Sequence, residues 1–173
     1  YFAFSTNISL LLVERGVTDT AMSGIATAIF MLGGCLFGFV FTRLLGLCKG
    51  WTACLAFVLL AASYLVIYCF DGIVPLLAAA FVGGGSLSVI FPFFLVTIAG
   101  QVDPTVSVMA SSLILSVGPN LGSFVSPMIL TNLSRLLFGP GVSGRFLLAA
   151  ILAVSLAGVL FALGLKKRGA AIK

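Results

Sequence analysis

The sequence SSLILSVGPNLGSFVSPMILTN at positions 111–132 is a long apolar segment interrupted by serine, glycine, proline and asparagine. On a helix, with about 100° between successive residues, these interruptions fall on two separate stripes. The polar stripe comprises Ser112, Ser116, Asn120 and Ser123. The small-residue stripe comprises Ser111, Gly118, Gly122 and Ser126. The segment therefore predicts a helix whose small-residue stripe packs closely on a neighbouring helix and whose polar stripe needs water, a ligand or a polar partner.

A purely structural interpretation of the same segment is also open. Serine hydroxyls on a packing helix can bond back to carbonyl groups of their own helix. Pro119 and Pro127 each remove a backbone donor and clash with the preceding turn, so we expect a kink. A membrane tolerates such a kink only where other groups satisfy the freed carbonyls.

Charged residues are rare in the chain and are segregated along it. Hydrophobic residues make up 61% of the 173 residues and charged residues 8%, which is too few charges for the surface of a soluble domain. Uncharged runs of 20 residues or more occupy 20–42, 50–70, 72–102, 104–134 and 146–165. Because about 20 helical residues cross a hydrocarbon core of about 30 Å, we predict an all-α, polytopic membrane helix bundle with five full transmembrane helices and a partial one.

The partial helix is the apolar stretch at positions 1–13, which begins with Tyr1 and is too short to span a bilayer. We expect it to be the tail of a truncated helix; a signal peptide is the rival interpretation, but no basic region precedes it. The predicted spans form one membrane domain over residues 1–173. They are 1–13 (partial), 21–45, 51–70, 73–99, 105–132 and 146–165.

Glycines and prolines in the other spans predict close helix contacts and bends. They are Gly34 and Gly38 in the second span and Gly83, Gly84, Gly85 and Pro92 in the fourth. Ser86, also in the fourth span, either lines a cavity or bonds to a backbone carbonyl of its own helix.

The residue types argue against an enzyme, a metal site or a cofactor. The chain has no histidine, and its four cysteines lack C-x-x-C spacing. No serine–lysine pair or buried acid pair lies within a span, so a nucleophile would lack a base. No acidic or basic residue lies deep in a full span, so we do not expect this chain to carry a proton-coupling carboxylate.

The basic residues predict the orientation in the membrane. Six of the nine fall on one side if the C-terminus is cytoplasmic, namely Arg43, Lys49, Lys166, Lys167, Arg168 and Lys173. Only Arg15, Arg135 and Arg145 then lie outside. We therefore expect an integral, multi-pass protein of the plasma membrane or bacterial inner membrane.

Two motifs resemble those of a known family. Gly38, Arg43, Gly46 and Lys49 echo a turn of the form G-x-L-x-D-R-x-G-R-K, with threonine in the aspartate position and one residue inserted. The sequence GPNLG at 118–122, followed by SP at 126–127, is similar to a glycine-proline pattern in an eleventh helix. In both respects the chain resembles the C-terminal six-helix half of a major facilitator superfamily transporter, with the seventh helix truncated.

The resemblance implies secondary active transport of a small solute by alternating access, with the lipid bilayer and a second six-helix half as partners and no nucleic acid. Arg43 and Lys49 would belong to a cytoplasmic turn. The helices that line the central cavity of this family supply the candidate cavity residues. They are Asn7, Ser86, Ser112, Ser116, Asn120 and Ser123.

Two other functions stay open. The same helices could form a non-transporting membrane receptor or a regulatory half-module, which would use its polar stripe for contact with a partner. Alternatively, the chain could be the N-terminal half of a drug or metabolite efflux antiporter, because a similar G-P-x-x-G pattern in the fifth helix of the family is associated with antiporters.

Overall fold

The computed structural model describes residues 2–17, 19, 21–48, 51–100 and 103–170, and the side chains of all of these except 2, 104, 105 and 163–170. Its helices are α1 (Phe2–Glu14), α2 (Ala21–Cys48), α3 (Thr52–Cys69), α4 (Ile73–Ala99), α5 (Pro104–Phe138) and α6 (Ser143–Ala170). No strand occurs among the described residues, so the prediction of an all-α fold is confirmed. Five of these helices, all except α1, are long and apolar enough to cross a membrane.

The helices lie where the apolar spans are, and the differences are at their ends. α2 continues to Cys48, so Arg43 belongs to a helix and not to a turn. α5 continues to Phe138 and takes in Arg135, and α6 begins at Ser143 and takes in Arg145. Hydropathy identifies only the part of a helix that is apolar enough for the hydrocarbon core of a bilayer. The backbone hydrogen bonds of the helix continue beyond that part into the polar interface, so the helices end later than the apolar spans do.

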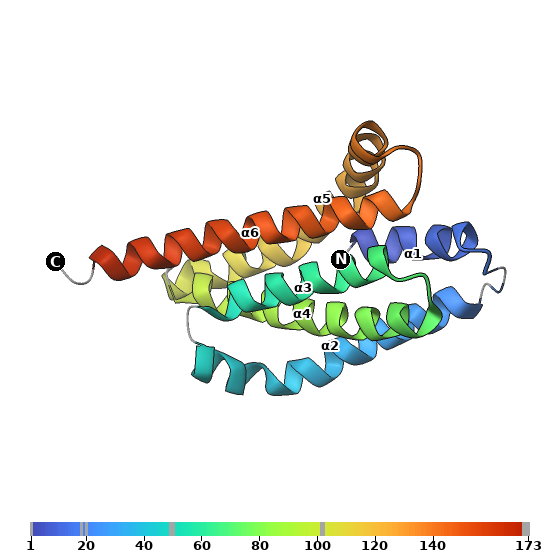
Figure 1. Ribbon diagram of the computed structural model, residues 1–173. Helices are drawn as coiled ribbons and strands as arrows, with labels where there is room; N and C mark the ends of the chain where they lie inside the picture. Colours follow the sequence, from blue (N-terminus) through green and yellow to red (C-terminus); the bar gives the residue numbers. More distant parts are fainter. Residues whose placement is uncertain (1, 18, 20, 49–50, 101–102, 171–173) are drawn as a thin grey trace.

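The helices form a bundle in which α4 packs against both α2 and α3, and α3 also packs against α6 (Figure 1). The short α1 lies at one end of this bundle, near the C-terminal end of α3 and the start of α6 (Figure 1). α5 is bent, and its last turns project from the bundle (Figure 1). Pro119 and Pro127 lie inside it, and each removes a backbone hydrogen bond and so favours such a bend.

α2 and α4 cross at glycines. A Cβ atom added to Gly33 would lie 2.0 Å from the carbonyl oxygen of Phe81, and one added to Gly84 would lie 1.8 Å from that of Phe30. A Cβ at Gly85 would lie 2.6 Å from the ring of Phe37. Because no side chain fits at these distances, glycine is what allows the two backbones to approach.

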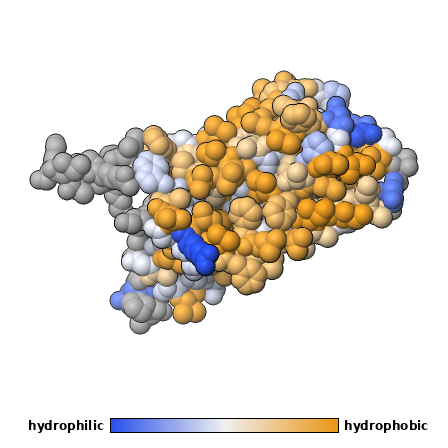
Figure 2. Space-filling model, turned by 60° about the horizontal axis from the view of Figure 1, so that its bottom comes forward, coloured by the Kyte–Doolittle hydropathy of each residue, from blue (hydrophilic) through white to orange (hydrophobic). Residues whose placement is uncertain are grey.

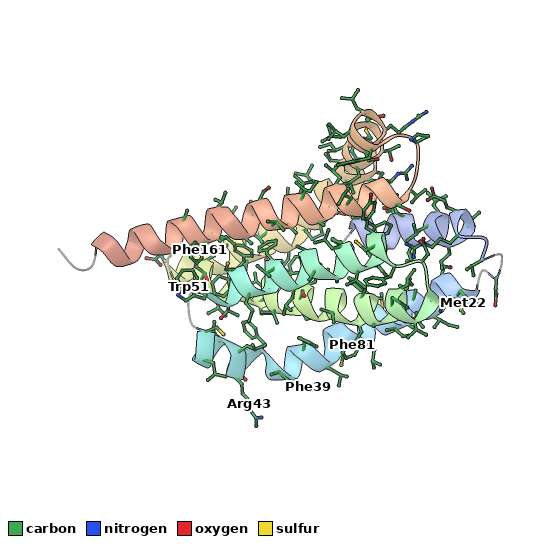
Figure 3. The ribbon with its side chains drawn as sticks, in the orientation of Figure 1. Met22, Phe39, Arg43, Trp51, Phe81 and Phe161 are labelled. Carbon is green, nitrogen blue, oxygen red and sulfur yellow. The ribbon has the colours of Figure 1, made fainter. Side chains whose placement is uncertain are left out.

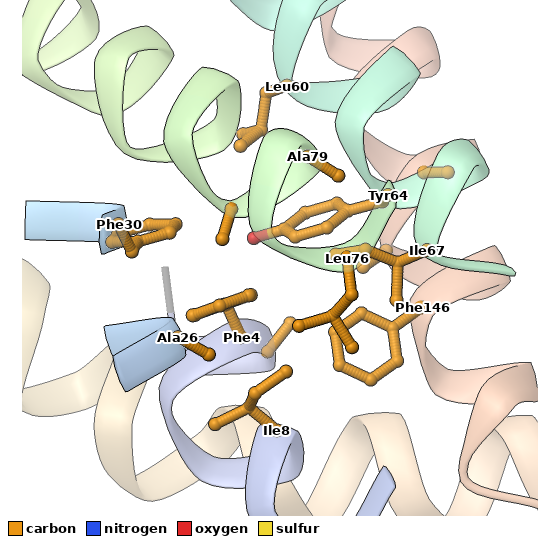
Figure 4. Packing of buried hydrophobic residues seen from close by; sticks show 14 of the residues in the cluster. Phe4, Ile8, Ala26, Phe30, Leu60, Tyr64, Ile67, Leu76, Ala79 and Phe146 are labelled. Atoms are coloured by element: carbon orange, nitrogen blue, oxygen red, sulfur yellow. The ribbon is translucent and has the colours of Figure 1, made fainter. Parts of the chain in front are cut away.

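Aromatic and aliphatic side chains from several helices fill the core around this crossing (Figure 4). Phe4 of α1 stacks on Phe30 of α2, with ring centroids 4.5 Å apart. Tyr64 of α3 meets Phe146 of α6 edge to face at 6.0 Å. The rings therefore join α1, α2, α3 and α6 in one apolar core.

The surface of the bundle is largely apolar. Figure 2 shows a broad hydrophobic face, with hydrophilic residues mainly toward its ends. Phe39 is 79% exposed and points away from the bundle, as does Arg43 further along α2 (Figure 3). Trp51 packs on Phe161 with ring centroids 4.8 Å apart (Figure 3). An apolar surface of this extent, on helices of this length, is typical of a protein surrounded by lipid.

Candidate functional site

The polar stripe of α5 lies on the outside of the bundle. Ser112, Ser116 and Asn120 are exposed, and Ser123 is half-buried. The amide Nδ2 of Asn120 donates to the carbonyl oxygen of Ser116 at 2.6 Å, and the Ser123 hydroxyl donates to the carbonyl oxygen of Asn120 at 2.9 Å. Both bonds stay within α5, so neither attaches the stripe to another helix.

The small-residue stripe of α5 faces the bundle, but across open space. Gly118, Gly122 and Ser126 line a cleft of about 680 Å³ whose other walls come mainly from α3, α4 and α6. A Cβ atom added to Gly118 would meet nothing within 4 Å. Among the described residues of α5, only Leu130 and Ser134 are buried. The side chains of α5 are therefore exposed or half-buried along most of its described length, although the helix contacts α1, α4 and α6.

Two other candidate cavity residues are inside the bundle. Asn7 is 3% exposed; its Nδ2 donates to the carbonyl oxygen of Ala3 at 2.9 Å, and its Oδ1 accepts from Nη1 of Arg145 at 2.6 Å. Ser86 is 1% exposed and donates to the carbonyl oxygen of Val82 at 2.8 Å. Neither residue lines the cleft, and the hydrogen bonds of both are to groups of the protein itself.

Asn7 belongs to a cluster that we call the polar clamp, which comprises Asn7, Glu14, Arg15, Asp71 and Arg145. Oε2 of Glu14 accepts a hydrogen bond of 2.9 Å from the backbone N–H of residue 142, just before α6. The side chain of Arg15 is only 12% exposed; its Nη2 donates to the carbonyl oxygen at position 67 in α3, and its Nε lies 3.2 Å from Oδ1 of Asp71. The polar clamp thus ties α1 to α3, to the start of α4 and to the start of α6.

Of these residues, Arg15 and Arg145 served only to predict orientation from the sequence, and the clamp was not predicted. Alternation of the spans places the ends of the first, third and fifth spans at one end of the bundle, and Arg15 and Asp71 have opposite charges. The ion pair of Arg15 and Asp71 could therefore have been predicted from the sequence. The other contacts of Arg15 and Glu14 are to backbone groups, which a hydropathy pattern does not reveal.

A second groove, of about 570 Å³, lies between α2 and α4. Gly34, Gly38, Gly84 and Pro92 line it. A Cβ atom added to Gly34 would lie 2.8 Å from the Ser88 hydroxyl, whereas one added to Gly38 would meet open space. Gly34 therefore lies at the crossing of the two helices and Gly38 lies beyond it.

Three further candidates are simpler to place. A Cβ atom added to Gly83 would lie 2.9 Å from the hydroxyl of Ser63, so this glycine packs α4 against α3. Arg43 is exposed on α2, and Lys49 lies outside the described residues. Within the described part of the chain, no group of three or more potential ligands could hold a metal ion.

No protein-family model, curated protein or solved structure matches the chain.

Proposed function

We propose that the protein is a secondary active membrane transporter of the major facilitator type, which moves a small solute by alternating access. The observation that carries this proposal is the exposure of Ser112, Ser116 and Asn120 on a helix long and apolar enough to cross a membrane. The bond to Ser116 uses one donor of the Asn120 amide. It leaves the second amide hydrogen and the carbonyl oxygen to find partners that lipid cannot supply. Water, a solute or a second polar wall therefore covers the stripe.

A second six-helix unit facing the polar stripe would provide that wall. The solute would then bind between the two units near the middle of the bilayer, as in transporters built from repeated halves. The groups that α5 offers to it are neutral amides and hydroxyls, so they would contribute hydrogen bonds and no charge. The cytoplasmic side would be the end that carries Arg43, and the polar clamp would lie on the opposite side.

The way in which α5 is attached also supports a moving part. Among its described residues only Leu130 and Ser134 are buried, and both lie near its C-terminal end. Pro127 interrupts the backbone hydrogen bonds between that end and the polar stripe, and Pro119 interrupts them within the stripe. A helix attached in this way can change its tilt while the core of the other five helices stays packed. Alternating access needs such a bistable element beside the solute path.

Cysteine accessibility tests the proposal. In a background with Cys35, Cys48, Cys54 and Cys69 replaced by alanine, we would compare Asn120→Cys with Leu121→Cys in membrane vesicles, using a charged, membrane-impermeant methanethiosulfonate. Leu121 is the matched control because it is adjacent along α5 and 58% exposed in the structure. Only the thiolate reacts, and it forms in water, so we expect position 120 to react about tenfold faster or more.

Equal rates at the two positions, or no reaction at 120, would count against an aqueous path. Protection of 120 in intact membranes that disappears when the protein is isolated in detergent would instead favour the non-transporting module. In that module a partner protein, and not water, covers the polar stripe.

A further inference from the structure

We propose that the last turns of α5, residues 128–138, lie along the membrane interface and bind an anionic phospholipid, whose phosphate contacts Arg135 and Asn132. We call these turns the interfacial segment. They are separate from the proposed solute path, because the polar stripe ends at Ser123 and the interfacial segment begins after Pro127.

α5 is longer than a membrane span needs to be. Its 35 residues make a helix of about 52 Å, at 1.5 Å per residue, whereas a hydrocarbon core is about 30 Å thick. The part that ends at Pro127 is about 36 Å long and crosses the core by itself. Beyond Pro127 the helix turns away from the common direction of the other helices and projects from the bundle (Figure 1). The interfacial segment is therefore surplus to the span and can run along the membrane surface.

The interfacial segment has one face on the bundle and an apolar face beside it. Leu130 and Ser134 are buried against the bundle. Leu133, Leu136 and Leu137 are exposed, and Leu136 is exposed to 82%. With about 100° between successive residues, these three leucines lie within an arc of about 100°. They form an apolar face that no other part of the chain covers within the described residues, and acyl chains can cover it.

A polar face lies about 120° around the helix from the exposed leucines. It contains Asn132 and Arg135, which are three positions apart and therefore neighbours on the helix surface. Both side chains are exposed, and neither has a hydrogen bond or an ion pair within the described part of the chain. A helix with an exposed apolar face and a cationic face lies in the interface, with its apolar face among the upper parts of the acyl chains.

Arg135 determines the kind of head group. A charged side chain is costly in the hydrocarbon core, so the guanidinium lies at the level of the lipid head groups. The acidic groups of the polar clamp do not neutralise it, because Glu14 accepts a backbone N–H and Asp71 pairs with Arg15. The planar guanidinium matches the geometry of a phosphate, and the amide of Asn132 can donate a further hydrogen bond. A net negative charge on the lipid adds electrostatic attraction.

Fluorescence quenching by nitroxide lipids tests the position of the segment. In the whole chain with its four cysteines replaced by alanine, Leu136→Cys carries a bimane label in phosphatidylcholine vesicles, and Asn132→Cys is the matched position on the polar face. A nitroxide high on the acyl chain should quench the label at 136 more strongly than a nitroxide on the head group does. The order should be reversed at 132.

Two results would overturn the interfacial position. Strongest quenching at both positions by a nitroxide near the methyl end of the acyl chain would mean that the segment crosses the hydrocarbon core. Absence of quenching at 136 by any acyl-chain nitroxide would mean that the segment lies in water.

Brominated lipids test the head group. With the label at position 136, brominated phosphatidylglycerol should associate about fivefold more strongly than brominated phosphatidylcholine, which is the effect of one basic residue near an anionic lipid. Arg135→Gln should abolish this preference, and Arg135→Lys should keep most of it because the charge remains. Arg43→Gln is the matched control, because Arg43 is also exposed but lies far from the last turns of α5 (Figure 3); it should leave the preference unchanged.

Equal association of the two lipids, or a preference that survives in Arg135→Gln, would overturn the binding of an anionic head group. Loss of the preference in Arg43→Gln would mean that the net charge of the protein attracts the lipid, and it would overturn the role of Arg135 as well. Both arginines are exposed, so these variants leave the core intact. None of these results would affect the cysteine test of the proposed transport path.

Discussion

The crossing of α2 and α4 leaves no room for one added methyl group. In Gly84→Ala the new Cβ would start 1.8 Å from the carbonyl oxygen of Phe30 and 2.7 Å from its carbonyl carbon. Both are backbone atoms, so neither can rotate away, and the helices must separate by roughly 1.5 Å to restore ordinary contact. Overpacking of this kind lowers the free energy of unfolding by about 1–3 kcal/mol. Because the clashing atoms on both helices belong to the backbone, we expect Gly84→Ala to lower the free energy of unfolding by about 3 kcal/mol.

Gly33→Ala provides an internal check on this reasoning. Its Cβ would lie 2.0 Å from the carbonyl oxygen of Phe81, so the same separation of α2 from α4 would relieve both clashes. We therefore expect the double variant to cost less than the sum of the single variants by about 1 kcal/mol or more. Gly38→Ala is the control on α2; it meets open space, and the higher helix propensity of alanine makes it neutral or stabilising by up to about 1 kcal/mol.

Thermal unfolding in detergent, followed with a thiol-reactive fluorophore, measures these differences. Cys54 is the reporter, because its Sγ lies 3.5 Å from the carbonyl oxygen of Ala157 at the interface of α3 and α6; Cys35, Cys48 and Cys69 are replaced by alanine. At about 2–4 °C per kcal/mol for a chain of this size, Gly84→Ala should lower Tm by about 6–12 °C. The reasoning is refuted if Gly84→Ala unfolds at the same temperature as Gly38→Ala.

Three further predictions concern polar groups and use the same unfolding assay. Asp71→Asn should lower the free energy of unfolding by at most about 1 kcal/mol, because the side chain is 84% exposed. Arg15→Gln should lower it clearly more, because it also removes the hydrogen bond to a carbonyl group of α3. Equal effects would contradict the role of Arg15 in joining helices. Asn7→Ala and Arg145→Ala should each lower the free energy of unfolding by about 1.5–3 kcal/mol. The double variant should lose less than the sum of the two, because each single variant removes the same charge-assisted hydrogen bond. Additive effects would mean that the bond contributes nothing to stability. Tyr64→Phe should stabilise the protein by about 1 kcal/mol, because it removes a buried hydroxyl that has no hydrogen-bond partner among the described residues, and a loss of stability would show that the hydroxyl is already bonded.

Hydropathy was sufficient to predict the all-α fold and the position of the apolar helices, because the cost of exposing charge to lipid depends only on local sequence. Helical periodicity was sufficient to separate the two stripes of α5, which the structure turns to different surroundings. Neither hydropathy nor helical periodicity could predict which residues of two helices pack against each other. Four-residue spacing singled out Gly34 and Gly38 on α2, yet the closest approach to α4 is at Gly33, and Gly38 meets open space.

Contacts between distant elements explain the rest of what the sequence did not reveal. Asn7 was a candidate for the cavity because it is polar and lies in an apolar segment. The structure buries it against Arg145, which is 138 positions away in the chain. The open space beside Gly118 could not be predicted either, since glycine in a membrane helix normally indicates a close contact with a neighbouring helix. Whether a small residue meets a neighbour or a cleft depends on where the whole helix is attached.

The central claim is that the polar stripe on α5 opens in turn to each side of the membrane. The most direct test is the rate at which an impermeant, charged methanethiosulfonate modifies Asn120→Cys in sealed vesicles of each orientation, with Leu121→Cys as the control. Alternating access predicts that Asn120→Cys is modified from either side while Leu121→Cys reacts from neither. Modification of Asn120→Cys from one side only, or from neither side, would contradict the account.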